Sequence, residues 1–415
     1  MASVINHPVV KNDRATFSEP LVEIAVHHDY PDTQNLLHSS PSEGPKESPE
    51  LKNSGGQVLT GKVKGGRRPR LPLKRDEACC KRGASSGPLT SRKQKVRYGV
   101  IVGTLVVLAV AIAFAILSWD NGMEFGSAGY WKIASMRADV LIAMVIVAIC
   151  QAFATVAFQT VTGNRIITPS IMGFEALYTV IQTGVVFFFG AAGVTMVMGA
   201  GQFLLQAVLM VGLACLLYGW LLSGRFGNMH IMLLVGVVVG GGLGALSTFM
   251  QRMMDPNEFD ILTARLFGNL SNADSDLYPI VIPIVLVTAA LLWVKSPKLN
   301  TISLGKDVST NLGVNHRREV MIVLFLVSIL MAMTTSLVGP MTFLGFLVAT
   351  LAYSLTDTYD HKLIFPVASL LAFVVLGAAY FVLRNIFYAG GAVTIIIELV
   401  GGVVFLFVIM RKGRL

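Results

Sequence analysis

The 415-residue chain has little charge and few of the residues from which catalytic or metal sites are built. Only 14% of its residues are charged, and it has 7 histidines and 4 cysteines. Cys79 and Cys80 are adjacent, whereas Cys150 and Cys215 lie singly in apolar runs. This spacing fits neither a disulfide framework nor a metal site. We therefore expect no metal ligands and no cofactor.

Catalytic motifs are also missing from the sequence. It contains no GxxxxGK[ST] phosphate-binding loop and no HExxH zinc motif. The chain therefore has no evident means of binding or hydrolysing ATP, and we expect that it is not an enzyme.

Apolar residues dominate instead, at 54% of the chain, and the 40 glycines are spread through the apolar stretches. This composition is typical of a polytopic membrane protein. We predict an all-α fold in which the Gly339-Pro340 pair separates two of ten spans. The predicted spans are 99–119, 138–159, 171–190, 198–221, 231–252, 277–295, 319–338, 340–356, 363–383 and 393–410.

The N-terminal residues 1–95 are rich in Ser, Pro, Gly and charge, and we predict a disordered, basic cytoplasmic tail followed by a transmembrane domain at 96–415. Residues 1–98 hold 17 Lys and Arg against 10 Asp and Glu, while the rest holds 16 against 14. Since the excess lies in the tail, we expect no nucleic-acid binding by the body. The tail's basic clusters could touch anionic lipid headgroups or serve only as a topological anchor.

Basic residues also predict the orientation of the spans. With the N-terminus inside, the inner loops and C-terminus carry eleven Lys and Arg besides the tail, and the outer side carries five. This bias places both termini in the cytoplasm of a multi-pass plasma-membrane protein.

The polar interval from Lys298 to Arg318 holds a short amphipathic pattern. Leu304, Val308 and Leu312 recur every four positions, which places them on one face of a helix of about two turns. Ser303 could cap its start and Gly313 could end it. Such a short helix is not stable by itself, so we expect it to lie on a partner protein or on the lipid surface.

Polar side chains also occur within the predicted spans. They could line a wet translocation path, and interhelical hydrogen bonding is an equally weighted alternative. Two acids, Glu175 and Glu398, lie in the third and tenth spans, and Glu398 is the deeper of them. The candidate path residues are Gln151, Thr155, Gln159, Gln182, Thr183 and Glu398.

Two further patterns concern the surfaces of the spans. Gly236, Gly240 and Gly244 repeat every four residues and predict close helix packing. Arg137 and Arg384 lie at outer span ends, where they could bind carboxylates of a docking protein or extend towards lipid headgroups.

Several ordered motifs resemble the iron-siderophore permease family, the FecCD type of ABC importer subunit, and most closely its iron-chelate uptake branch. The resemblance runs through about residues 99–415. The motifs are FQTVTGNRIITPSIMGFEALYTVIQT (158–183), LNTISLGKDVSTNLGV (299–314), LVGPMTFLGFLVATLAY (337–353), LRNIFYAGG (383–391) and ELVGGVVFLFVIMRK (398–412).

The resemblance implies a type II importer bundle, like that of the vitamin B12 importer, with about ten transmembrane helices. It implies three protein partners: a separate ATP-binding ABC subunit, a second permease subunit, and an extracytoplasmic siderophore-binding protein that meets Arg137 and Arg384. The chain departs from the family's RLPR motif after Arg137, where it reads Ala138-Asp139-Val140. The implied ATPase-coupling helix contains Leu304, Gly305, Lys306, Asp307, Val308, Leu312 and Gly313.

The prediction is a permease subunit that imports a ferric siderophore. A haem or cobalamin importer is the alternative within the family. A proton-coupled secondary transporter that uses Glu398 and a membrane scaffold without transport are alternatives from other classes. Exchanging Glu398 for Gln would abolish coupling in the secondary transporter but only perturb packing in an importer. A bulky residue at Gly305 or a reversed charge at Asp307 would uncouple an importer from its ATPase.

Overall fold

The computed structural model describes residues 88–89, 91–119, 124, 126–196, 199–223, 229–268, 270, 273–387 and 393–412. The predicted tail of residues 1–95, with Cys79 and Cys80, lies almost entirely outside these ranges. All regular elements in the described ranges are helical, which confirms the predicted all-α class.

The ten predicted spans each overlap a helix. Eight helices in the described ranges are long and apolar enough to cross a membrane, and α11 and α13 are shorter apolar helices. Two helices, α6 and α8, were not predicted. The elements are α1 (Arg92–Ser118), α2 (Ala128–Thr162), η2 (Ser170–Phe174), α3 (Glu175–Met196), α4 (Ala200–Ser223), α5 (Met229–Arg252), α6 (Pro256–Leu266), η4 (Ser275–Leu277), α7 (Tyr278–Val294), α8 (Ser296–Ile302), α9 (Lys306–Asn311), α10 (His316–Val338), α11 (Leu344–Thr356), α12 (His361–Asn385) and α13 (Thr394–Lys412).

Helix α2 is central and packs against α7, α10, α11 and α12. Small side chains such as Ala148, Ala152 and Ala157 are buried along it, and small residues let helix backbones approach closely in a membrane. Phe153 of α2 stacks on Phe365 of α12 with ring centroids 4.3 Å apart. Movement of any of these helices therefore changes contacts that α2 makes.

A second group of contacts joins α3, α5, α6 and η2. A Cβ atom at Gly240 of α5 would lie 3.0 Å from Cα of Gly173 in η2, and one at Gly236 would lie 2.9 Å from Met172. These two glycines pack closely, as the sequence predicted. Gly244 has open space around its Cα instead, so the third glycine of the repeat does not take part.

The break predicted at Gly339-Pro340 is present. Helix α10 ends at Val338, and Gly339 follows with φ 97° while its N–H donates to Thr335 O. A Cβ at Gly339 would lie 3.0 Å from Cα of Gly268. Only glycine fits both the dihedral angle and the space.

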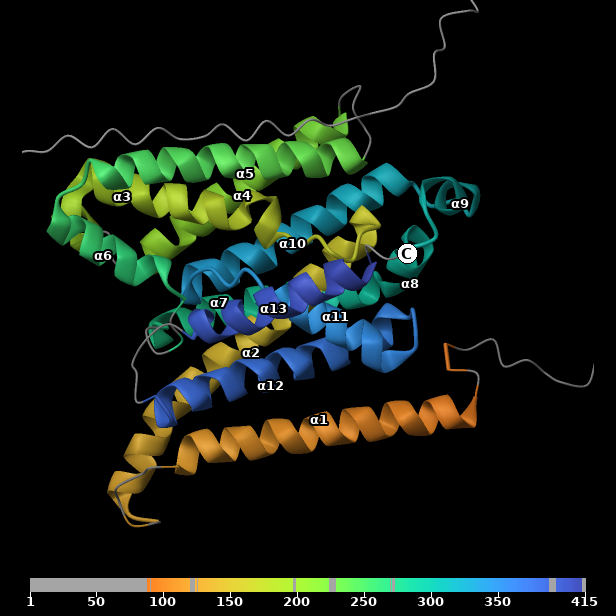
Figure 1. Ribbon diagram of the computed structural model, residues 1–415, viewed down its shortest axis with the longest axis horizontal. Coiled ribbons are helices and arrows are strands. Elements are labelled where there is room, and N and C mark those ends of the chain that lie inside the picture. The colour runs from red at the N-terminus through yellow and green to blue at the C-terminus, as the bar shows by residue number, and fades with distance from the viewer. Residues whose placement is uncertain are drawn as a thin grey trace, which may run out of the picture. The chain divides into compact units, whose positions relative to one another are not determined.

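The short helices mark the two ends of the bundle in Figure 1. Helices α8 and α9 lie at one end, and α6 lies at the other. We call these the α9 end and the α6 end. The ion pair between Arg97 and Asp357 places the start of α1 at the α9 end, beside the loop between α11 and α12.

Candidate functional site

The predicted amphipathic helix corresponds to the short helix α9, and a second short helix, α8, precedes it across a sharp turn. Gly305 adopts φ 98° and ψ 168°, a conformation that is essentially limited to glycine, so α8 stops and α9 begins at Lys306. The predicted cap was wrong: Ser303 follows the end of α8, and its hydroxyl donates to Asn300 O at 2.7 Å. Gly313, with φ 82°, follows the end of α9 as predicted.

An apolar row faces outward at this end. Leu304, Val308 and Leu312 are 58%, 46% and 62% exposed, and Lys306 and Asp307 are exposed beside them. Val308 lies within α9, Leu304 precedes the Gly305 turn, and Leu312 follows the last residue of the helix. Three large exposed apolar side chains within nine residues are typical of an interaction surface. We call this row, Leu304, Val308 and Leu312, the apolar row.

The opposite side of α9 is fixed to the bundle. Ser309 is buried, its hydroxyl donates to Lys306 O at 2.9 Å, and its oxygen lies 2.9 Å from Nδ1 of His316, the first residue of α10. Helix α9 is thus held on one side and exposed on the other.

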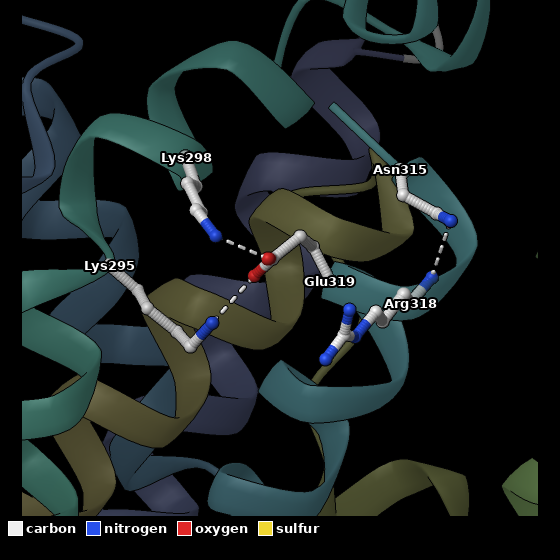
Figure 2. Close-up of polar contacts among 5 residues, drawn as sticks. All are labelled: Lys295, Lys298, Asn315, Arg318 and Glu319. Atoms are coloured by element: carbon white, nitrogen blue, oxygen red, sulfur yellow. Dashed lines mark hydrogen bonds and ion pairs between the residues drawn. The ribbon is translucent and has the colours of Figure 1, made fainter. Parts of the chain in front are cut away.

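Helix α8 is fastened to α10 by charge, as Figure 2 shows. Lys295 Nζ lies 2.6 Å from Glu319 Oε2, and Lys298 Nζ pairs with Glu319 Oε1. The Glu319 side chain is only 10% exposed. Asn315 caps the start of α10, where its Oδ1 accepts from the backbone N–H of Arg318 at 3.2 Å. The partly buried carboxylate is therefore paired with two cations.

Helix α8 also meets the start of α12. Asn300 Nδ2 donates to Asp360 Oδ1 at 3.0 Å, and Asn300 Oδ1 accepts from the backbone N–H of His361 at 3.1 Å. The segment formed by α8 and α9 is thus attached to α10 and α12.

The structure places two of the candidate path residues between α2 and α11. Gln151 and Thr155 are 1% and 0% exposed, and their side-chain polar atoms have no partner among the described residues. Both lie against Gly345, where a Cβ atom would lie 2.1 Å from Thr155 Oγ1 and 3.1 Å from Gln151 Oε1. In this conformation neither side chain borders an open path.

Three other candidates form hydrogen bonds. Gln182 Nε2 donates to Gln206 Oε1 at 2.7 Å, and Thr183 Oγ1 lies 2.8 Å from Ser247 Oγ. Gln159 Nε2 donates to Arg165 O at 2.7 Å. The first two are the interhelical bonds that the sequence left open as the alternative.

A cavity of about 420 Å³ lies near the α6 end, and Gln182 and Gln206 both line it. Arg265 and Ser336 contribute further polar groups. Of the candidate path residues, Gln182 is therefore the one beside an appreciable space.

The two acids lie differently. Thr342 donates to Glu175 Oε2 at 2.5 Å, so Glu175 bonds to the loop that follows α10. Glu398 is exposed on α13, and the exposed apolar side chains Ile395 and Leu399 lie near it in the helix. The single subunit thus presents a carboxylate on an otherwise apolar helix surface.

The two candidate docking arginines are not equivalent. Arg137 donates from Nη1 to the carbonyls of Ile116 and Trp119, at 3.1 and 2.6 Å, near the end of α1. Arg384 is exposed and donates from Nη1 to the hydroxyl of Tyr380 at 2.6 Å. Arg384 is the more accessible of the two. Among the described residues, no three His, Cys, Asp or Glu side chains gather as a metal site would require.

Comparison with known proteins now identifies the family. The model of the FecCD transport family matches residues 100–411. The chain belongs to the FecCD transport family. It is therefore a multi-pass membrane protein of a transport family, and FecCD proteins are permeases rather than a class of enzymes.

Two FecCD relatives match over most of their length. The petrobactin import system permease protein FatC of Bacillus anthracis is 46% identical over 331 residues, which cover 80% of this chain and 94% of that protein. The petrobactin import system permease protein YclO of Bacillus subtilis is 30% identical over 323 residues, which cover 78% and 99%.

A solved structure shares the fold. A metal-chelate type ABC transporter in an inward-facing conformation superposes with a TM-score of 0.66 at 20% identity, covering 76% of this chain and 99% of that one. This likeness confirms the predicted importer-type bundle of about ten helices.

Some residues at the α9 end were missed by sequence reasoning. Glu319 carries a signal in retrospect, because it is the acid in the first turn of α10 and follows the basic pair Lys295 and Lys298. Asn300 and His361 carry none, since they are 61 positions apart and meet only through folding.

Proposed function

We propose that the chain is the permease subunit of an ABC importer that moves a ferric siderophore across the plasma membrane. The observation that carries this proposal is the 46% identity to a petrobactin import permease over 94% of its length. Iron is cargo here, held by the siderophore, and the chain supplies no ligands to it.

A separate ATPase subunit drives transport in this proposal. The sequence has no phosphate-binding loop, so energy must arrive through a contact. The apolar row on α9, with Lys306 and Asp307 beside it, is the surface that we assign to the ATPase. This assignment requires the α9 end to face the cytoplasm, as the distribution of basic residues predicts.

The remaining partners follow from the same proposal. A second permease subunit would cover Glu398, because a carboxylate facing lipid at membrane depth is costly. The translocation path would then run between the two subunits, with Glu398 beside it. An extracytoplasmic siderophore-binding protein would meet the α6 end, where Arg384 is better placed than Arg137 to bind its carboxylates.

Uptake by a deletion strain tests the proposal. Cells that lack the gene would be complemented with it and supplied with ferric petrobactin, haem or cobalamin, each labelled. The expected result is restored uptake of ferric petrobactin alone. Restored uptake of haem or cobalamin would show that the cargo is not a ferric siderophore. Uptake that persists when the ATPase subunit is inactivated would reject the assignment to an ABC importer.

A further inference from the structure

A chain of three polar side chains, two of them buried, connects the segment of α8 and α9 to the central helix of the bundle. It begins at Asn300 in α8, passes through His361 at the start of α12, and ends at Thr160 in the last turn of α2. His361 is 2% exposed and Thr160 is 8% exposed. Water therefore has little access to replace these hydrogen bonds.

The direction of each bond follows from its neighbours. Asp360 accepts from Asn300 Nδ2 at 3.0 Å, which turns Asn300 Oδ1 towards His361. That oxygen accepts from the backbone N–H of His361 and from its ring Nδ1. The ring proton is thereby assigned to Nδ1.

The other ring nitrogen then has one role left. Nε2 of His361 lies 2.6 Å from Thr160 Oγ1, and with the proton on Nδ1 it can only accept. The single Thr160 hydroxyl proton then points to Nε2 instead of to Val156 O, which lies 2.8 Å away. Each bond in the series from Thr160 through His361 and Asn300 to Asp360 thus joins a donor to an acceptor. A sequence separation of 201 residues lies between Thr160 and His361, so the bond is purely tertiary.

We propose that Thr160, His361 and Asn300 form a relay that transmits displacement of α8 and α9 to the central helix α2. The proposal deepens the assignment of the α9 end as the ATPase contact, and it rests on that assignment. These three are positioning residues, since none of them touches cargo or nucleotide. Because α2 packs on α1, α7, α8, α10, α11 and α12, a displacement that reaches Thr160 reaches most of the bundle.

The chain offers a matched control for Thr160. Thr162 is also buried in the last turn of α2, and its Oγ1 donates within its own helix to Phe158 O at 2.8 Å. Thr160 Oγ1 likewise lies 2.8 Å from Val156 O, but it alone also reaches His361. Valine has the shape of threonine without the hydroxyl, so T160V removes the relay bond and T162V removes only a bond within the helix.

The test uses the complete complex of permease, ATPase subunit and binding protein in proteoliposomes. Two rates are measured: ATP hydrolysis, with and without loaded binding protein, and uptake of radiolabelled ferric petrobactin. We expect T160V to assemble normally, to keep basal hydrolysis, and to lose about tenfold in both stimulation and uptake, the factor expected for one lost buried hydrogen bond. T160S should keep wild-type rates, and so should T162V.

Variants of His361 separate its two bonds. His361→Asn keeps a donor near Asn300 and loses the hydrogen bond to Thr160. His361→Gln keeps an acceptor near Thr160 and loses the hydrogen bond to Asn300. A relay needs both bonds, so both variants should be as uncoupled as T160V, and adding T160V to His361→Asn should cause no further loss.

Several outcomes would overturn the relay. The first is wild-type stimulation of ATP hydrolysis in T160V, and the second is a loss of stimulation in T162V equal to that in T160V. The third is a T160S variant that does not keep wild-type rates. The fourth is failure of T160V to assemble with the ATPase subunit, which would make the contact merely structural. Failure of the proposed cargo looks different. A wild-type complex whose hydrolysis is stimulated but which moves no ferric petrobactin rejects the cargo and still tests the relay through stimulation.

Discussion

Lys295 and Glu319 form an ion pair with a distance of 2.6 Å between Nζ and Oε2, which ties the junction of α7 and α8 to the first turn of α10. Lys298 binds the other oxygen of the same carboxylate. One side chain from a transmembrane helix thus binds two cations at the start of the segment that carries α8 and α9.

Exchanging Glu319 for Gln should weaken this attachment. The exchange leaves two cations without their counter-charge, and we expect the free energy of unfolding to fall by about 1–2 kcal/mol, since the site is partly buried. Thermal unfolding of the detergent-solubilised permease measures the change. Asp260→Asn on α6 is the control, because Asp260 is exposed and forms no ion pair within the described residues. An equal loss in both variants would contradict a specific role for the Glu319 pair.

The apolar row should be needed for ATPase binding but not for folding. Val308→Asp places a charge in the middle of the row, where 46% of Val308 is exposed. We expect copurification of the ATPase subunit to fall at least tenfold, as loss of an apolar contact of about 1.5 kcal/mol allows. The melting temperature of the permease alone should be unchanged. Thr310→Asp, on the same helix and outside the row, is the matched control, and normal ATPase binding by Val308→Asp would move the contact elsewhere.

The transmembrane spans and the break between α10 and α11 could be predicted because their signals are local in the sequence. Runs of about twenty apolar residues set the spans, and Gly339 with Pro340 sets the break between α10 and α11. Helix α6 was missed because its 11 residues are amphipathic and too short to span. The exact start of α9 also escaped prediction, because it depends on the backbone conformation of Gly305 rather than on a capping side chain at Ser303.

The contacts that join distant segments could not be predicted. Gln182 and Gln206 are 24 residues apart, and Thr160 and His361 are 201 residues apart. A single sequence says which side chains are polar within a span but not which helix faces which. Gln182 was therefore equally compatible with a path and with an interhelical bond.

Position 345 should tolerate a side chain only if the side chain of Thr155 is made smaller. A Cβ atom there would lie 2.1 Å from Thr155 Oγ1. Gly345→Ala should lower the free energy of unfolding by about 1–3 kcal/mol through overpacking, and adding Thr155→Ala should restore part of it. Thermal unfolding of the two single variants and the double variant measures the coupling. Gly103→Ala, with nothing within 4 Å of its Cβ position, should cost nothing. Additive losses at Gly345 and Thr155 would show that the two do not press on each other.

Cysteine labelling should separate the candidate path residues by exposure. In a chain with its four native cysteines replaced, Glu398→Cys should react with a membrane-impermeant thiol reagent, because residue 398 is exposed on α13 and the proposed path passes beside it. Gln151→Cys should stay unmodified, because residue 151 is 1% exposed between α2 and α11. Mass spectrometry of the assembled complex measures the labelling at both positions.

If the path runs between two permease subunits, ferric petrobactin should slow labelling at position 398, since the cargo competes for the same space. If lipid rather than cargo covers position 398, this position should stay unlabelled in the complex. Labelling at position 151 instead would place the path in the interior of the subunit.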